Sequence, residues 1–491
     1  MKVQEILNTI EVGNSVAEFD NQLKNYFVET DIFRALIEDK ADIIAGDKGT
    51  GKTALYRYLH HRYTEFNELA NVELITAFNP SGNPIFQRLA YTGPLDEGQY
   101  SAIWKMYILS LVGNWLLQLC DGVYLENTQK LSNLLAQTGL RSQDDRPVTI
   151  FSRLTQWVQR FTNPKAAGID VTFDISGIPV VTPKIEFEDP VPKVADFSSD
   201  FILHDDALYL LNASLAENDI TIWIALDRLD EAFVGFPDVE MPALRALFRT
   251  YLDLLAFERI KLKLFVRKDL FRKITQNRFV NLTHINARKR EIIWDKEDLL
   301  VMLCRRLREN KAFLALVDRP DVLNEQLFDF IFPEQVDVGE RRSTTWNWMI
   351  SHTKDGNGAI PPRNLIDLVN KAKEEQLRRE QRQPRVYVDR LPLIEPEAIK
   401  RALTRLSHDR LEDTLLAEAS RDVAVLIEAF RDSKAEHNDD SIAELFGVDK
   451  LKAKSFAKIL IDIGFFEQTK ESYKIPILYR DGLNITLGKA Y

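Results

Sequence analysis

Residues 46–53, Gly-Asp-Lys-Gly-Thr-Gly-Lys-Thr, have the types and spacing of a loop that holds phosphate groups. The glycines allow the backbone to curl so that several N–H groups point at one anion, and a following helix adds the positive end of its dipole. Lys52 can reach the β- and γ-phosphates of a nucleotide, and the Thr53 hydroxyl can bind Mg²⁺. An ordinary glycine-rich turn is the alternative. The sequence therefore predicts that ATP and Mg²⁺ are bound by Gly46, Asp47, Lys48, Gly49, Thr50, Gly51, Lys52, Thr53 and Ala54.

Acidic residues for the same chemistry follow the apolar run Ile220–Leu226. Such a run predicts a buried strand, and ligands of open α/β sheets bind at the carboxyl ends of the strands. Asp227 is placed there to hold the Mg²⁺ shell, usually through water. Glu231 or Asp230 could polarise an attacking water as a general base. The alternative is a surface loop that carries three acids.

Two arginines are candidates for contact with the γ-phosphate. The alternating segment 260–266 predicts a strand that ends at Arg267, next to the strand that carries the acid. Arg363 follows two prolines that favour the start of a helix, where a cation is unfavourable unless an anion is nearby. We therefore expect Arg363 to reach the phosphate from a helical lid. The alternative is a solvated arginine paired with Asp367 one turn later.

To bring the loop and the acidic residue together, the fold must place a strand before each of them and a helix after the loop. The apolar run Ile43–Ala45 and the helical pattern from Ala54 meet that requirement for the loop. Further strands are predicted at Val72–Phe78 and Phe279–Ile285. These patterns predict a core over residues 1–285, with an insertion at about 81–197 that includes a β-hairpin in 169–187.

The rest of the chain is predicted to be mainly helical. A helical lid covers 286–380 and includes Arg363, and the highly charged segment 377–390 suggests an exposed linker. Residues 391–491 have the order of a winged helix, with a short helix near 440–447, a second helix at Leu451–Ile463 and a small hairpin. The expected fold class is α/β, a P-loop NTPase parallel-sheet core with a helical lid and a C-terminal winged-helix domain.

The predicted second helix of this last domain carries lysines at every fourth position, Lys450, Lys454 and Lys458. One face of the helix could therefore meet DNA phosphates or the major groove, through residues 441–479. Against this, residues 441–491 hold eight basic and six acidic side chains, which is a weak positive balance. Winged helices also serve in protein docking or oligomerisation, and both possibilities stay open.

Composition limits the class of protein. The 491 residues suggest two to four domains, and a net charge of −10 argues against general coating of nucleic acid. No apolar run approaches the length of a membrane span, and the first residues lack the apolar segment of a signal peptide. Two cysteines exclude a disulfide framework or a cysteine-rich metal site. We therefore expect a cytoplasmic protein that does not bind a membrane.

Together, the motifs GDKGTGKT, DRLDEAF, FVRKD and PPRNL resemble those of bacterial P-loop ATPases of the AAA+/STAND-like group, over roughly residues 20–380. The chain looks most like a defence-associated P-loop ATPase family and is similar to the KAP ATPases. The resemblance implies nucleotide-dependent switching, often with oligomerisation, and in bacteria often a place in anti-phage defence. The matching nucleotide-site positions are Lys52, Thr53, Asp227, Glu231, Arg267 and Arg363.

The chain departs from that pattern in two respects. The interval between Lys52 and Asp227 is long, which reflects the insertion. In addition, no single arginine finger can be named, because Arg245, Arg249, Arg272 and Arg278 are all candidates.

The leading hypothesis is an ATP-hydrolysing conformational switch that controls self-assembly, as a homo-oligomer, or an effector protein. Catalysis of this kind depends on positioning and charge stabilisation, so few residues are needed. The alternative is a nucleotide-controlled DNA-binding protein that acts through the winged helix. A small-molecule kinase is disfavoured, because the lid arginine and the acidic pair suit hydrolysis better.

Overall fold

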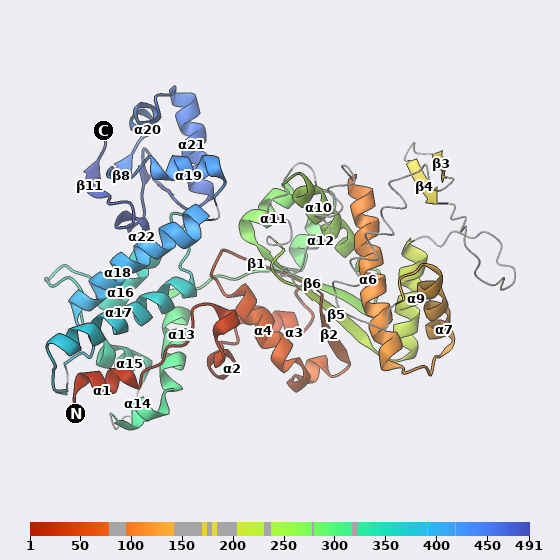
Figure 1. The fold of residues 1–491 in the computed structure, drawn as a ribbon, viewed down its shortest axis with the longest axis horizontal. Coiled ribbons are helices and arrows are strands. Elements are labelled where there is room, and N and C mark those ends of the chain that lie inside the picture. Colours follow the sequence, from red (N-terminus) through yellow and green to blue (C-terminus); the bar gives the residue numbers. More distant parts are fainter. Residues whose placement is uncertain are drawn as a thin grey trace. The chain divides into compact units, whose positions relative to one another are not determined.

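The computed structural model describes residues 1–77, 95–141, 204–229, 237–276, 279–316, 323–389, 391–417 and 419–491, with the backbone of strands at 169–173 and 179–183. These residues form two compact units that are interleaved along the chain (Figure 1). The sheet unit comprises Asp31–Ala45 and Leu59–Glu291, and the helical unit comprises Met1–Thr30, Gly46–Tyr58 and Ile292–Tyr491. The domain limits predicted at 285, 380 and 391 stay a prediction.

The sheet unit is built on a five-stranded sheet of order β2-β5-β6-β1-β7. The β2–β5, β5–β6 and β1–β7 pairs are parallel, with registers such as Val72↔Thr221 and Ile43↔Lys289. The predicted parallel sheet is therefore confirmed. The strands are β1 (Ile43–Gly46), β2 (Val72–Thr76), β5 (Thr221–Leu226), β6 (Ile260–Arg267) and β7 (Lys289–Glu291).

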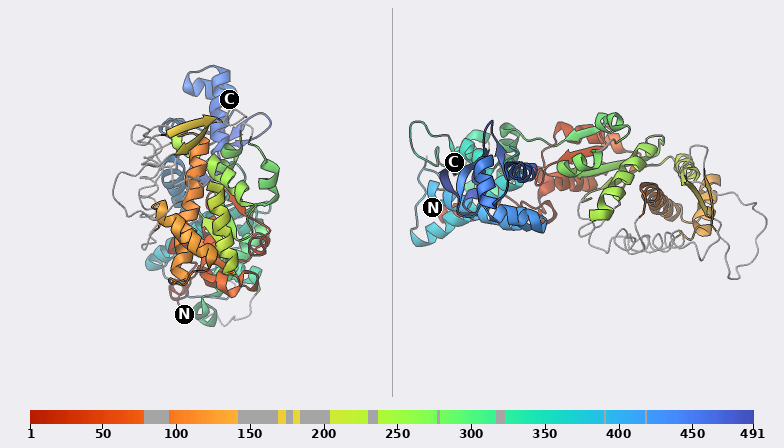
Figure 2. Two further views of the ribbon diagram at one scale, coloured as in Figure 1. Left: turned by 90° about the vertical axis from the view of Figure 1, so that its right-hand side faces the viewer. Right: turned by 90° about the horizontal axis from the view of Figure 1, so that it is seen from above.

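Apolar side chains cover both faces of β1, as expected of a central parallel strand. Ile43 and Ala45 point into the core shared with the large helices of the sheet unit, whereas Ile44 points to the opposite face, and all three are fully buried. Helices α6, α7 and α9 pack against one another (Figure 2). The helices of this unit are α3 (Asp31–Ile37), α6 (Glu97–Leu119), α7 (Glu126–Gln137), α9 (His204–Glu217), α10 (Pro237–Leu254), α11 (Lys268–Thr275) and α12 (Leu282–Ala287).

The fifth strand lies elsewhere than predicted. Residues Leu282–Ala287 form helix α12, and the strand that pairs with β1 is β7, of sequence Lys-Arg-Glu. The prediction at Phe279–Ile285 was wrong because β7 is a short edge strand with no apolar side chain to mark it. The predicted hairpin is present as β3 (Ile169–Phe173) and β4 (Pro179–Pro183), while its expected segment 184–187 lies outside the described residues.

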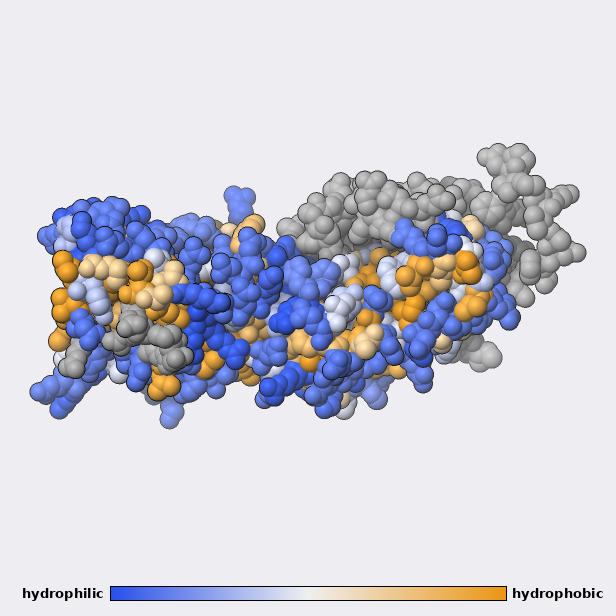
Figure 3. All heavy atoms as spheres, turned by 90° about the horizontal axis from the view of Figure 1, so that it is seen from below, coloured by the Kyte–Doolittle hydropathy of each residue, from blue (hydrophilic) through white to orange (hydrophobic). Residues whose placement is uncertain are grey.

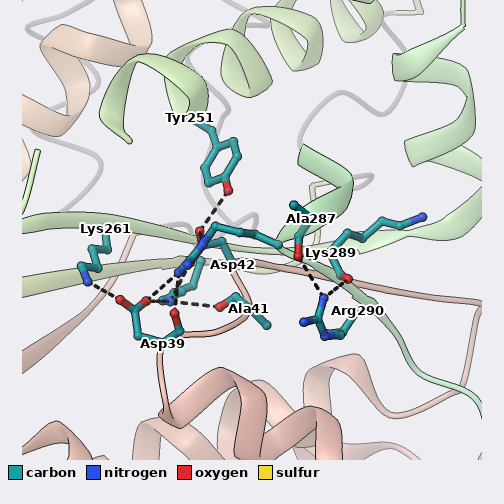
Figure 4. A network of polar contacts seen from close by, with 10 residues as sticks. Asp39, Ala41, Asp42, Tyr251, Lys261, Ala287, Lys289 and Arg290 are labelled. Carbon is teal, nitrogen blue, oxygen red and sulfur yellow. Dashed lines mark hydrogen bonds and ion pairs between the residues drawn. The ribbon is translucent and has the colours of Figure 1, made fainter. Parts of the chain in front are cut away.

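The sheet is pinned at the amino end of β1 by a buried charge cluster (Figure 4). Lys263 on β6 is fully buried and donates to Asp39 and Asp42, each over 2.7 Å. Arg288, just before β7, also pairs with Asp42, and Tyr251 donates to the same carboxylate over 2.9 Å. Asp42, just before β1, thus binds Lys263 of β6 and Arg288, the residue before β7, which belong to the two neighbours of β1 in the sheet.

The helical unit has its own core, to which the amino-terminal helix contributes. Helix α17 packs along α18 and also contacts α1. The predicted linker at 377–390 was wrong in its first part, because α17 continues to Arg382 and buries Glu380, which pairs with Arg385. The helices are α1 (Val3–Asn8), α2 (Leu23–Tyr26), α13 (Lys296–Arg308), α14 (Lys311–Leu316), α15 (Asn324–Ile331), α16 (Thr345–Thr353), α17 (Pro362–Arg382) and α18 (Pro396–Arg410).

The predicted winged helix is confirmed at the end of the chain. Its four-stranded sheet has the order β11-β8-β10-β9, and α20 packs against α21. Its elements are α19 (Arg421–Glu428), β8 (Lys434–His437), α20 (Asp439–Phe446), α21 (Lys450–Asp462), β9 (Glu467–Gln468), β10 (Tyr473–Lys474), α22 (Ile477–Arg480) and β11 (Thr486–Lys489).

The surface carries both polar and apolar side chains. Figure 3 shows one face, on which hydrophilic side chains predominate and apolar side chains gather in several patches. Within the part of the chain that the structure describes, no helix has the length and apolar character needed to cross a membrane.

Candidate nucleotide site

The glycine-rich loop connects β1 to α4 (Lys52–Arg62) and curls around the ammonium group of Lys52. Lys52 Nζ donates to the carbonyl oxygens of Gly46 and Asp47, each over 2.9 Å, and Thr50 Oγ1 donates to the Asp47 carbonyl over 2.8 Å. Gly49 and Gly51 have φ angles of +75° and +101°, which side-chain-bearing residues rarely adopt. The loop therefore has the turn that its sequence predicted.

Helix α4 begins at Lys52, so Thr53 and Ala54 lie in its first turn. The first N–H groups of a helix have no partner within the helix, and together with the dipole they favour an anion. A lysine, a hydroxyl and the first N–H groups of the helix thus lie within three successive residues. This donor set fits the phosphate groups of a nucleotide.

Two residues from later in the helical unit hold the loop. Trp294 Nε1 donates to the Thr50 carbonyl over 2.8 Å. The backbone N–H of Arg363 donates to the Gly49 carbonyl over 3.5 Å. A Cβ atom on Gly49 would lie 3.1 Å from Cβ of Arg363 and 3.2 Å from Cβ of Pro361. The start of α17 therefore abuts the loop, where the sequence predicted a lid arginine.

The guanidinium of Arg363 is partly buried and its Nε atom has no hydrogen-bond partner among the described residues. Burial lowers the pKa of Arg363, which indicates that the charge is held away from water. The alternative pairing with Asp367 does not occur, because Asp367 is bound by Arg410. A cation at a helix N-terminus with an unused buried donor fits an anionic ligand.

Asp227 and Arg267 end two adjacent strands of the sheet unit. Asp227 directly follows β5 and is only 7% exposed, and Arg267 is the last residue of β6. Arg228, next to the acid, has a left-handed backbone with φ of +58°. The order β5-β6-β1 places the carboxyl end of β6 between the other two on one edge of the sheet. That edge is where Asp227 was predicted.

The guanidinium of Arg267 already has an acidic partner. Its Nε and Nη2 atoms donate to the two carboxylate oxygens of Asp269 over 3.1 and 3.0 Å. Burial alone would raise the pKa of Asp269, but the ion pair with Arg267 holds it below its usual value. A sensor role for Arg267 thus requires exchange of this pair and stays a prediction. Glu231, Asp230 and Arg278 lie outside the described residues.

Sequence reasoning missed three residues around the loop: Trp294, Arg410 and Asp355. No local motif marks Trp294 or Arg410, because each acts on a distant segment. Asp355 lies in the turn between α16 and α17, where burial and the nearby carboxylate of Asp47 raise its pKa to about 6. The turn signal Gly356-Asn357-Gly358 next to it was the available clue.

No group of three or more metal-binding side chains occurs in the described ranges. The assignment of Thr53 and Asp227 as Mg²⁺ ligands stays a prediction.

Comparison with protein-family models found no match, and comparison with curated proteins found no relative. Three solved structures illustrate the likeness of the fold. Aeropyrum pernix ORC2, in ADPNP–ADP complexes, has a TM-score of 0.42 and 13% identity over 95% of this chain and 97% of that chain. Aeropyrum pernix ORC1 in complex with DNA has a TM-score of 0.36 and 10% identity over 96% of each chain. Cdc6p from Pyrobaculum aerophilum has a TM-score of 0.27 and 12% identity over 90% and 88%.

The sheet order and the loop of this chain define its fold class. It is an α/β P-loop NTPase fold with a helical lid and a C-terminal winged-helix domain. The particular resemblance to a defence-associated ATPase family has no matching family model and stays a prediction.

Proposed function

We propose that this protein binds ATP with Mg²⁺, hydrolyses it, and uses its nucleotide state to control self-assembly or a partner protein. The observation that carries the proposal is the position of Arg363. Its backbone contacts Gly49 of the loop, while its buried Nε has no partner among the described residues. A phosphate bound by the loop would supply the missing acceptor and would join the loop to α17.

Each predicted residue has a role in this proposal. Lys52 and the first N–H groups of α4 bind the phosphates, and Thr53 and Asp227 hold Mg²⁺, which neutralises phosphate charge when bound. Glu231 or Asp230 orients and activates the water, and Arg267 and Arg363 contact the γ-phosphate. The chemistry is hydrolysis, because the residues serve positioning and charge stabilisation rather than capture of a second substrate.

Titration of ATP and ADP by calorimetry, followed by product analysis with radiolabelled ATP, tests the proposal. Lys52→Ala should weaken ATP binding by about tenfold or more, since charged hydrogen bonds contribute about 1.5–3 kcal/mol. Arg363→Ala should reduce ATP binding and hydrolysis with little effect on ADP. Arg382→Ala, at the exposed far end of the same helix, is the matched control. Hydrolysis by Lys52→Ala at the wild-type rate would contradict the proposal, and transfer of phosphate to a molecule other than water would identify a kinase.

The alternative function is DNA contact through 441–479, where the lysines of α21 would meet phosphates. Lys450 and Lys454 on α21 pair with Asp440 and Asp439 of α20, at 2.6 and 3.6 Å. Two of the three lysines thus have acidic partners within the domain, and because these ion pairs are exposed a DNA phosphate could displace them at little cost. If DNA is bound, its affinity should depend on salt and fall when Lys450, Lys454 and Lys458 are changed to Glu.

A further inference from the structure

We infer that Arg410 is a positioning residue that keeps Arg363 available to the nucleotide, because it binds two acceptors in the first turns of α17, Asn364 and Asp367. This inference rests on the proposed function. It assigns a role to a residue that belongs to α18, outside every motif of the loop and the lid.

The contacts of Arg410 bind two acceptors at the start of α17. Arg410 is the last residue of α18 and is 6% exposed. Its Nε donates to Asn364 Oδ1 over 2.7 Å, and its Nη2 forms an ion pair with Asp367. Asn364 in turn donates to the carbonyl oxygen of Thr353 over 2.9 Å, at the end of α16. The fork of the guanidinium thus joins three helices beside the loop.

The pairing with Asp367 matters because of its spacing from Arg363. Residues four apart on a helix lie on the same face, so the Asp367 carboxylate is the natural partner of Arg363. Arg410 takes that carboxylate. Asp413, one turn beyond Arg410, acts electrostatically on both arginines, but no hydrogen bond or ion pair joins it to either among the residues described. Arg363 is therefore left with an unused donor next to Gly49.

The two arginines also repel one another. Burial, and then the charge of Arg363, lower the pKa of Arg410 to about 10. A buried Arg410 and a partly buried Arg363 together favour an anion that can approach one of them. Asp367 forms an ion pair with Arg410 and not with Arg363. An anionic ligand is therefore favoured at Arg363.

The same turn of α18 contacts the winged-helix domain. Gly482 N donates to Ser407 Oγ over 2.9 Å, and Thr404 Oγ1 donates to Asp481 over 2.6 Å. A Cβ atom on Gly482 would lie only 3.0 Å from the Ser407 carbonyl oxygen. Helix α18 thus carries both Arg410 and these contacts with the segment that follows α22.

The test compares the affinities for ATP and ADP in four proteins. Arg410→Met should weaken ATP binding by about tenfold with ADP binding unchanged, because Asp367 then pairs with Arg363. Arg410→Met with Asp367→Asn should recover most of the ATP affinity, since the competing carboxylate is gone. If Arg410 only stabilises the fold, the double variant should bind ATP no more tightly than the single variant Arg410→Met. Arg405→Met, which loses ion pairs between α18 and α17 at Glu374 and Glu375, is the matched control and should leave the ratio of affinities unchanged.

The outcomes separate this inference from the proposed function. If Arg363→Ala weakens ATP binding but Arg410→Met does not, or if Asp367→Asn gives no recovery, the role of Arg410 is overturned and the ATP site stands. If the wild-type protein binds no ATP, both are overturned. If Arg410→Met fails to fold, Arg410→Gln is used instead, because it keeps a donor toward Asn364. The test is then whether Asp367→Asn restores the ATP affinity of Arg410→Gln.

Discussion

The indole Nε1 of Trp294 donates a 2.8 Å hydrogen bond to the carbonyl oxygen of Thr50, in the middle of the phosphate-binding loop. Trp294 lies just before α13, so the loop is tied to the first segment of the chain after β7. Together with the contact between Gly49 and Arg363, this bond gives the carbonyl oxygens of Gly49 and Thr50 partners from α17 and from the segment before α13.

Trp294→Phe keeps the aromatic ring and removes the donor. The Thr50 carbonyl then loses its partner, and a hydrogen bond of this kind contributes about 0.5–1.5 kcal/mol. We expect ATP and ADP to bind about 2- to 10-fold more weakly, to the same extent for both, when measured by calorimetry. Trp346→Phe, whose ring contacts Phe328, is the control. Unchanged nucleotide affinity in Trp294→Phe would show that the bond does not order the loop.

Gly49→Ala tests the contact between the loop and α17. The new methyl group would meet Cβ of Arg363 at 3.1 Å and Cβ of Pro361 at 3.2 Å, at a φ of +75°. We expect nucleotide binding to weaken about tenfold, because the start of α17 or the loop must move and a left-handed alanine costs about 1–2 kcal/mol.

Gly139→Ala separates these two causes. Gly139 has a φ of +71°, and no atom lies within 4 Å of an added Cβ. It therefore carries the same backbone strain without the contact. Because Gly139 lies outside the loop, Gly139→Ala should leave nucleotide affinity unchanged and lower the free energy of unfolding through strain alone. An equal loss of stability in the two variants would mean that the closeness of Arg363 adds nothing to the cost at Gly49.

Local patterns were enough to predict most of the frame of the site. Apolar runs gave β1 and β5, the glycine spacing gave the loop, and two prolines gave the start of α17 with Arg363. Pairing between distant segments was not predictable in this way. Trp294 and Thr50 are 244 residues apart, and Arg410 and Asn364 are 46 apart, so no local period connects them. Strand β7 was missed for a related reason, since backbone pairing with β1 rather than apolar side chains defines it.

Asp355 predicts an unusual dependence of stability on pH. Its Oδ1 accepts the backbone N–H groups of Asn357 and Ala359, each over 3.0 Å. Burial raises its pKa to about 6, well above the value of about 3.9 in an unfolded chain. The native state therefore binds the proton more tightly. This contribution to stability falls as the pH rises from about 4 to about 6 and stays low above that range.

Asp355→Asn removes the free-energy cost of a buried carboxylate charge at neutral pH. It keeps an oxygen acceptor for both N–H groups. We expect a gain of about 1–3 kcal/mol in the free energy of unfolding at pH 7.5 and a smaller gain at pH 5, measured by urea unfolding at both pH values. Asp337→Asn should behave in the opposite way, because a hydrogen bond from Lys400 lowers the pKa of Asp337. A loss of stability in Asp355→Asn at pH 7.5 would contradict the assignment.

The last prediction concerns the charge cluster at the amino end of β1. Lys263→Met removes a fully buried ammonium that bridges Asp39 and Asp42, and leaves these carboxylates to Arg288 and Lys261. Removal of one partner from a buried pair typically costs about 3–5 kcal/mol, so urea unfolding should shift by that amount. The fluorescence of Trp223 should also change, because Lys263 Nζ lies 4.0 Å from the centre of its ring. Lys40→Met removes an exposed partner of Glu38 and should cost less than about 1 kcal/mol. Similar losses in the two variants would mean that the cluster does not hold β1, and with it the loop, in place.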